Sequence, residues 1–416
     1  MPRNRRAVMS TVLFSVIVAL AGSLVLFLGS TAQAAGRALA AAPKLPAAAK
    51  IKNPTPLSEV YASDAWTGAA FGWSVSASGS TAVVGAPYAN SYTGAAYVFT
   101  KVGGTWSQVA ELTASDPNSG DEFGWSVNIS GSTIAVGAPG YYNGIGAAYV
   151  FADSGGTWTQ QAELLDTDGT GDGADKFGYS VVTSGSSVMV GAKGYSGSKG
   201  AVYVFTDAGG SWTQEQKLIA DDAGVSDMFG WSMTLSGSQL VVSAVKAHND
   251  TGAIYVFTDS GGTWTQQAEL WASDGETENY FGDKVAISGK RIVAGAPGHD
   301  NEQGAVYVFT GSGATWKQVD ELTASDGGAN DCFGWAVGVS GKTVLVGAEQ
   351  TNAHSGAAYV FKLKGGSKWS QQSELTDGDG GTANEFGYSA YLSGTTAIVS
   401  ADQVPAGAGT AFIYRL

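Results

Sequence analysis

The chain is poor in the residues from which many catalytic and metal centres are built. Its 416 residues include one cysteine and three histidines. A single cysteine excludes a disulfide framework and any multi-cysteine metal site within one chain. The 14% charged and 44% hydrophobic content is that of a folded protein, not of a coiled coil or a disordered chain. Because 22 Lys and Arg face 36 Asp and Glu, no nucleic-acid partner is expected.

The first 34 residues have the organisation of a secretory signal peptide. Three arginines within the first six residues precede an apolar run that extends to about Leu28, and Ala32-Gln33-Ala34 fits a cleavage site. We expect cleavage after Ala34 and a secreted or cell-surface protein. The alternative is an uncleaved membrane anchor, since the apolar run is long enough to span a bilayer. Residues 35–55 are rich in Ala, Pro and Lys and predict a flexible linker.

Residues 56–416 consist of one unit repeated seven times. The dipeptide Phe-Gly recurs every 52 to 54 residues, at Phe71, Phe123, Phe177, Phe229, Phe281, Phe333 and Phe386. Each unit holds four short runs rich in Val, Ala, Tyr and Phe, bounded by Gly or Ser turns, and each run predicts a strand. No amphipathic stretch of helical period interrupts them. Four strands in about 52 residues is typical of a propeller blade.

The two ends of the repeat region predict how the ring closes. The seventh unit stops after its third strand, "GTAFIYRL", whereas "SEVYASD" at 58–64 aligns with "AELTASD" at 110–116. Because Ala110–Leu112 end the fourth-strand run "TWSQVAEL" of the first unit, the N-terminal segment is predicted to supply the missing outer strand, which leaves no open edge between the first and last blades. The predicted fold is all-β: a seven-bladed β-propeller with four strands per blade and an N-terminal velcro strand, over residues 56–416.

A second motif in each unit connects the repeats to a known family. Gly-Ala-Pro follows Phe-Gly by about 13 residues; it is complete at Gly85–Pro87, Gly137–Pro139 and Gly295–Pro297, and altered at Gly191–Lys193, Ser243–Val245, Gly347–Glu349 and Ser400–Asp402. The pattern resembles the FG-GAP repeat of integrin α-subunit propellers, in its bacterial secreted branch. The resemblance implies an extracellular binding or adhesion platform without a fixed ligand. The family's acidic calcium loop between the first and second strands is replaced here by a Ser-Gly turn, so those calcium sites are not expected.

Acidic residues gather on one predicted face. Of the 36 acids, 24 fall in the blade-joining loops or in the loops between second and third strands, which a propeller places on the same face. A concentration of negative charge on one face attracts cations or keeps the protein soluble. The segment 166–178 partly matches a calcium loop. Its candidate calcium ligands are Asp166, Asp168, Thr170, Asp172 and Asp175; no other cofactor is expected.

Aromatic and histidine side chains share the predicted acidic face. The candidate ligand-binding residues, all in loops between second and third strands, are Tyr88, Tyr92, Tyr141, Tyr142, Tyr195, His248, His299 and His354. Rings of this kind stack on sugars and anchor protein interfaces. The rings that directly follow Phe-Gly, and the tryptophans that open each fourth strand, are interpreted as packing residues.

No catalytic constellation emerges from the sequence, so we expect a non-enzymatic protein. The leading hypothesis is an adhesion or protein-binding module, monomeric and with an extracellular protein or glycan as its partner, without contact to a membrane unless the N-terminal segment stays uncleaved. A lectin-type carbohydrate-binding propeller is the first alternative. A polysaccharide hydrolase or lyase is the second, but plentiful carboxylates give paired-acid hydrolysis no specific support, and Cys332 lacks the orienting partners of a nucleophile.

Overall fold

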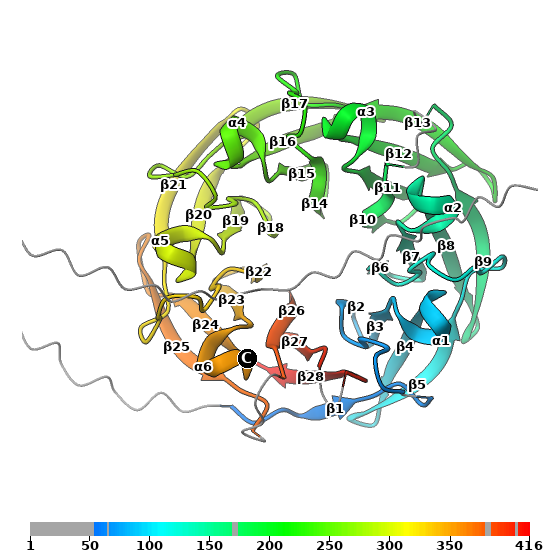
Figure 1. Cartoon of the computed structure of the whole chain (residues 1–416), viewed down its shortest axis with the longest axis horizontal. Helices are drawn as coiled ribbons and strands as arrows, with labels where there is room; N and C mark the ends of the chain where they lie inside the picture. The colour runs from blue at the N-terminus through cyan, green and yellow to red at the C-terminus, as the bar shows by residue number, and fades with distance from the viewer. Residues whose placement is uncertain (1–53, 65, 169–173, 379–383, 404–406) are drawn as a thin grey trace, which may run out of the picture. The chain divides into compact units, whose positions relative to one another are not determined.

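The structure, a computed structural model, describes residues 54–416 except 65, 169–173, 379–383 and 404–406. The predicted signal peptide and almost all of the predicted linker lie outside the described residues. Seven four-stranded antiparallel sheets stand side by side in a ring (Figure 1). The prediction of a seven-bladed all-β propeller is confirmed. Within the described part of the chain, no helix is long and apolar enough to cross a membrane.

Each blade uses its strands in sequence order from the centre of the ring outward. The inner strands are β2 (Ser74–Ser78), β6 (Ser126–Ser130), β10 (Phe177–Ser184), β14 (Phe229–Ser236), β18 (Val285–Ser288), β22 (Ala336–Ser340) and β26 (Phe386–Ser393). The second strands are β3 (Thr81–Ala86), β7 (Thr133–Ala138), β11 (Ser187–Ala192), β15 (Gln239–Ala244), β19 (Arg291–Ala296), β23 (Thr343–Ala348) and β27 (Thr396–Ala401). The third strands are β4 (Ala95–Val102), β8 (Ala147–Ser154), β12 (Ala201–Asp207), β16 (Ala253–Ser260), β20 (Ala305–Ser312), β24 (Ala357–Leu363) and β28 (Thr410–Arg415). The outer strands are β5 (Thr105–Leu112), β9 (Thr157–Leu164), β13 (Trp212–Leu218), β17 (Thr263–Leu270), β21 (Thr315–Leu322), β25 (Trp369–Leu375) and, for the last blade, β1 (Ser58–Val60).

The hydrophobic pattern of each strand follows from its place in the blade. Third strands such as β4 begin with five consecutive buried residues, because neighbouring blades cover both faces of the sheet. Outer strands such as β5 alternate between exposed and more buried positions, because their outward positions meet solvent. The core is therefore a series of clusters between adjacent blades rather than one central cluster.

The Phe-Gly dipeptide fastens each blade to the preceding one. The buried ring of Phe123 packs against Tyr149 and Phe151, with ring centroids 5.4 and 6.0 Å apart. Its backbone N–H donates to the carbonyl of Thr93 in the preceding blade, at 3.0 Å. Gly94, at a φ of 86°, lies so close that a Cβ there would stand 2.0 Å from the Phe123 carbonyl oxygen. Glycine is thus required at position 94, because the backbones of two adjacent blades come too close there for any side chain.

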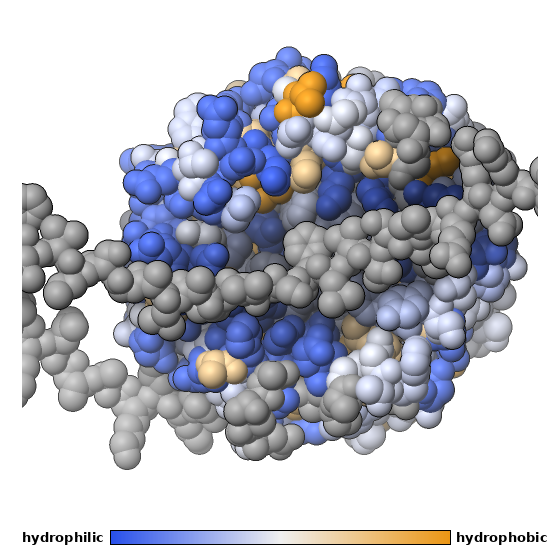
Figure 2. All heavy atoms as spheres, viewed as in Figure 1, coloured by the Kyte–Doolittle hydropathy of each residue, from blue (hydrophilic) through white to orange (hydrophobic). Residues whose placement is uncertain are grey.

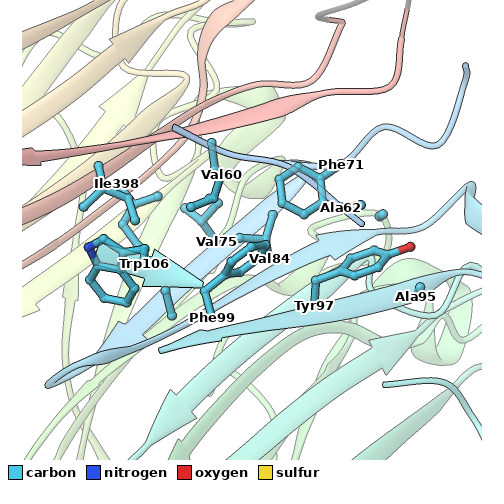
Figure 3. Packing of buried hydrophobic residues seen from close by; sticks show 14 of the residues in the cluster. Val60, Ala62, Phe71, Val75, Val84, Ala95, Tyr97, Phe99, Trp106 and Ile398 are labelled. Carbon is cyan, nitrogen blue, oxygen red and sulfur yellow. The ribbon is translucent and has the colours of Figure 1, made fainter. Parts of the chain in front are cut away.

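The ring closes through the N-terminal segment. β1 pairs antiparallel with β28, with Glu59 opposite Phe412. Val60 is 4% exposed and belongs to the hydrophobic cluster between the last and first blades, which also contains Phe71 and Ile398 (Figure 3). The Ser63 N–H donates to Gln108 Oε1 at 2.9 Å, which ties the same segment to blade one. The predicted velcro strand is present.

In the described part of the chain, six short turns lie between the second and third strands. They are α1 (Ala89–Tyr92), α2 (Tyr141–Gly144), α3 (Tyr195–Ser198), α4 (Ala247–Asp250), α5 (His299–Glu302) and α6 (Thr351–His354). Each contains consecutive left-handed residues, for example Tyr142 and Asn143 at φ of 47° and 62°. Antiparallel strand order puts these turns on the same side as the blade-joining loops. We name this side the loop face; Figure 2 shows its surface to be mostly hydrophilic.

Candidate functional site

A channel of about 690 Å³ runs between the inner strands at the centre of the ring. At its loop-face end stand the residues that directly follow each Phe-Gly. They are Trp73, Trp125, Tyr179, Trp231, Asp283, Trp335 and Tyr388, one from each blade, and we name them the collar. Because the repeat sets each blade at the same distance from the axis, one aromatic position per unit becomes a ring of side chains around the channel mouth.

The aromatic members of the collar pack on one another in tilted pairs. Ring centroids lie 4.6 Å apart for Trp73 and Trp125, and 5.0 Å apart for Trp73 and Tyr388. The series of contacts is interrupted in blade five, where Asp283 Oδ1 accepts a hydrogen bond of 3.1 Å from Trp231 Nε1. The sequence interpretation of these rings as packing residues describes half of their role, since they also line a cavity.

One side of the collar already holds a cation of the chain itself. Lys193 Nζ lies 3.7 Å from the ring centroid of Tyr179 and 4.1 Å from that of Trp231. Burial, together with the neighbouring Lys284 and Lys176, lowers the pKa of the Lys193 ammonium to about 8. Electrostatic attraction to the two ring faces is the compensation for this desolvation.

The other side of the collar holds buried carboxyl groups. Glu349 and Asp402 are 5% and 1% exposed. Among the described residues, Glu349 Oε2 and Asp402 Oδ1 have no hydrogen-bond partner. Burial, followed by the charge of Glu385, raises the pKa of both Glu349 and Asp402 to about 8. Their charges in turn act on the hydroxyl of Tyr388, which places them beside the collar.

This arrangement suits the binding of a cationic group. Buried carboxyl oxygens without partners cost free energy, and a bound cation with N–H donors would satisfy them. The neighbouring ring faces of Trp73, Trp335 and Tyr388 add cation–π attraction. Lys193 on the opposite side shows that this collar accommodates an ammonium group.

Of the eight predicted ligand-binding residues, Tyr88 alone is recorded in contact with a collar ring. Its centroid is 5.4 Å from that of Trp73, and the exposed Tyr92 lies 5.4 Å from Tyr88. Tyr141 donates to Asp116 at 3.0 Å, whereas Tyr142 is 71% exposed.

The remaining predicted ligand-binding residues lie at separate places around the loop face. Tyr195 accepts a hydrogen bond of 2.8 Å from Lys217. His248 and His299 each face acidic residues of their own blade or the preceding loop. His354 is exposed at the end of α6. The structure therefore does not gather these residues into a single site.

The predicted calcium loop is only partly described. Thr170 and Asp172 lie outside the described residues. Asp166 accepts a hydrogen bond of 2.8 Å from the Tyr203 hydroxyl, and Asp168 forms an ion pair with Lys217. Asp175 is buried. The ammonium of Lys217 thus already neutralises one of the predicted calcium ligands.

Cys332 has the environment of an inert thiol. It is buried, and burial together with nearby acids, first Glu349, raises its pKa to about 12. A thiol that stays protonated at neutral pH is a poor nucleophile.

The charged residues beside the collar were missed by the sequence interpretation, although a signal for them exists. Lys193, Glu349 and Asp402 each replace the proline of Gly-Ala-Pro. When a charged residue replaces an apolar one at a repeated position, that position is not explained by packing alone. Here three such positions lie at the mouth of one channel.

Comparisons with known proteins agree with the propeller geometry. One chain of the crystal structure of the Mitotic Checkpoint Complex aligns with a TM-score of 0.57 and 14% identity, over 92% of this chain and 99% of that chain; a likeness at this identity concerns the fold alone. No curated protein matches. The FG-GAP repeat matches seven times, at residues 57–99, 106–151, 158–205, 212–257, 264–309, 316–361 and 369–414. These matches cover more than half of the sequence, and the chain belongs to the FG-GAP repeat family.

Proposed function

We propose that this chain is an exported, non-enzymatic binding module that receives an ammonium group of an extracellular partner at the acidic side of the collar. The observation that carries the proposal is the pair of buried carboxyl groups, Glu349 and Asp402, each with an oxygen that lacks a hydrogen-bond partner beside aromatic rings. Membership of the FG-GAP family supports a binding or adhesion role in general.

A lysine side chain of a partner protein fits this chemistry best. A primary ammonium offers three N–H donors, enough to serve both carboxylates, and a flexible stem that can enter from the loop face. The chain's own Lys193 is the precedent for such a group against collar rings. A neutral sugar could stack on the rings, but it would supply no counter-charge when the two buried carboxyl groups ionise above about pH 8.

The test is a calorimetric titration of the full chain with Nα-acetyl-lysine methylamide at pH 9, where the carboxyls are ionised and most of the probe is still charged. We expect a Kd of about 1 mM, because one ion pair and two ring faces contribute about 4 kcal/mol. The Nε-acetylated probe, which lacks the charge, should not bind.

Two variants locate the binding. The double variant Glu349→Gln with Asp402→Asn should lose measurable binding, and Asp153→Asn, near the end of β8 on the opposite face, where the side chain accepts a hydrogen bond from the Gly156 N–H, should bind as the wild type does. Equal binding of the charged and the acetylated probe would contradict the proposal. Binding of neutral oligosaccharides alone would favour the lectin alternative.

A further inference from the structure

A second kind of acidic environment recurs at the rim of the loop face. In each of blades two to six, a buried third-strand tyrosine stands opposite an outer-strand residue, as Tyr149 stands opposite Glu163. An aspartate of the preceding blade-joining loop completes the group: the Tyr149 hydroxyl donates to Asp116 Oδ1 at 3.1 Å. We name this combination of tyrosine, outer-strand residue and loop aspartate the rim slot. It lies away from the collar and is built from other residues.

Two blades show how the rim slot is closed from within the chain. In blade two, the Tyr141 hydroxyl donates to Asp116 and fills the slot. In blade three, Lys217 replaces the glutamate, forms an ion pair with Asp168 and donates to the Tyr195 hydroxyl. A cation of the chain thus occupies the slot of blade three.

In blades four and five a histidine enters the rim slot instead. Asp222, His248 and Glu269 form one group, and Asp274, His299 and Glu321 form the other. Within each group one potential ligand atom per residue lies within 4.8 Å of the others. The two histidines come from different positions of α4 and α5, yet both reach the acid pair of their own slot.

The blade-five slot is the better formed of the two. His299 is 12% exposed as a side chain, with Nε2 3.7 Å from Asp274 Oδ2, whereas 47% of the His248 side chain is exposed. The Tyr307 hydroxyl is fully buried and has no hydrogen-bond partner in the described part of the structure. Its ring centroid lies 6.1 Å from that of His299, and Tyr307 stands opposite Glu321 in the pairing of β20 with β21, so it faces the same slot.

We infer that the rim slots of blades four and five are binding sites for a divalent transition metal, with zinc as the preferred ion. Zinc is bound in proteins by imidazole nitrogen and by carboxylate oxygen, the imidazole favours it over calcium and magnesium, and two carboxylates neutralise its charge. Ligand atoms of four-coordinate zinc stand about 3.3 Å apart, so small side-chain rotations would close each group around the ion. Water would supply the fourth ligand, and the free tyrosine hydroxyl can donate to a metal-bound carboxylate.

The experiment measures zinc bound per chain. The full chain is stripped with a chelator, equilibrated with 50 µM ZnCl₂ at pH 7.5, passed through a desalting column and analysed by inductively coupled plasma mass spectrometry. Thermal melting with and without zinc supplies a second readout, because an ion that binds the folded chain raises the melting temperature. We expect two zinc ions in the wild type and a rise in the melting temperature.

Histidine variants distinguish zinc bound in the two rim slots from zinc bound elsewhere on the protein surface. His299→Ala and His248→Ala should each lose one ion, and the double variant should lose both. His354→Ala, at an exposed histidine outside both groups, should retain two ions. Asp274→Asn, which keeps the side-chain shape, should lose the blade-five ion even if His299→Ala folds poorly. No zinc uptake by the wild type, or equal uptake by the double histidine variant, would overturn the inference; neither result bears on the collar.

Discussion

The replacement Asp402→Asn should stabilise the protein at high pH and leave it unchanged at low pH. The Asp402 pKa is about 8 in the folded chain but about 3.9 in an unfolded one. Between about pH 4 and about pH 8, the Asp402 carboxyl is protonated in the folded chain but ionised in the unfolded chain. The free energy of unfolding therefore falls as pH rises from about 4 to about 8 and is level above that. Asparagine removes this penalty, because it has no charge to bury.

The expected magnitude follows from the size of the pKa shift. One pKa unit corresponds to about 1.4 kcal/mol, so a shift of about four units sets a ceiling of about 6 kcal/mol. Because Asp402 also raises the pKa of Glu349, the carboxyls share part of this cost. We expect a gain of about 2–4 kcal/mol at pH 9. For a propeller of this size that is a rise of about 3–5 °C in melting temperature.

The assay is thermal unfolding followed by circular dichroism at pH 4 and pH 9. Glu349→Gln should behave in the same direction as Asp402→Asn, and the matched control Asp153→Asn should shift the melting temperature by less than about 1 °C at either pH. Destabilisation by Asp402→Asn at pH 9 would refute the reasoning, since it would mean that the ionised carboxylate has stabilising partners in the folded chain.

Three further predictions concern the fold and its processing. Deletion of residues 51–64 should lower the melting temperature by more than about 5 °C or cause aggregation, because β28 loses its outer partner β1 and the cluster around Val60 opens. Melting within a degree of the intact chain would show that the strand does not close the ring. Gly304→Ala should destabilise by at least about 3 kcal/mol in urea unfolding, because its Cβ would stand 2.0 Å from the Phe333 carbonyl oxygen at a φ of 83°, whereas Gly313→Ala, in an open hairpin, should cost about 1 kcal/mol. N-terminal sequencing of the protein from its native host should begin near Ala35, and an intact N-terminus in the membrane fraction would instead favour the anchor.

The fold could be predicted from the sequence because the seven repeats can be aligned with one another. The seven Phe-Gly dipeptides indicate seven blades. The match of the segment around Glu59 to that around Glu111 identifies the closing strand from sequence alone. The collar could not be predicted in the same way. Whether Trp73 points between blades or toward the axis depends on the tilt of the inner strand, which alternation of side chains alone does not specify. Packing was therefore the natural interpretation.

The charged part of the site escaped prediction for a different physical reason. Lys193, Glu349 and Asp402 lie in different blades, far apart in sequence, and only closure of the ring brings them to one mouth. The loop tyrosines and histidines were chosen because loops are exposed. Exposure does not imply that residues converge on one site, and four of the eight side chains, Tyr141, Tyr195, His248 and His299, instead reach the rim slots of their own blades.

The most direct test of the collar as an ammonium-binding site is fluorine NMR of the protein labelled with 5-fluorotryptophan. Signals are assigned by single Trp→Phe variants, and Nα-acetyl-lysine methylamide is then added at pH 9. The account predicts that the signals of Trp73 and Trp335 shift with the added probe, while those of Trp106 and Trp264, buried at the outer strands, stay fixed. Shifts confined to the outer-strand tryptophans, or none at saturating probe, would contradict it.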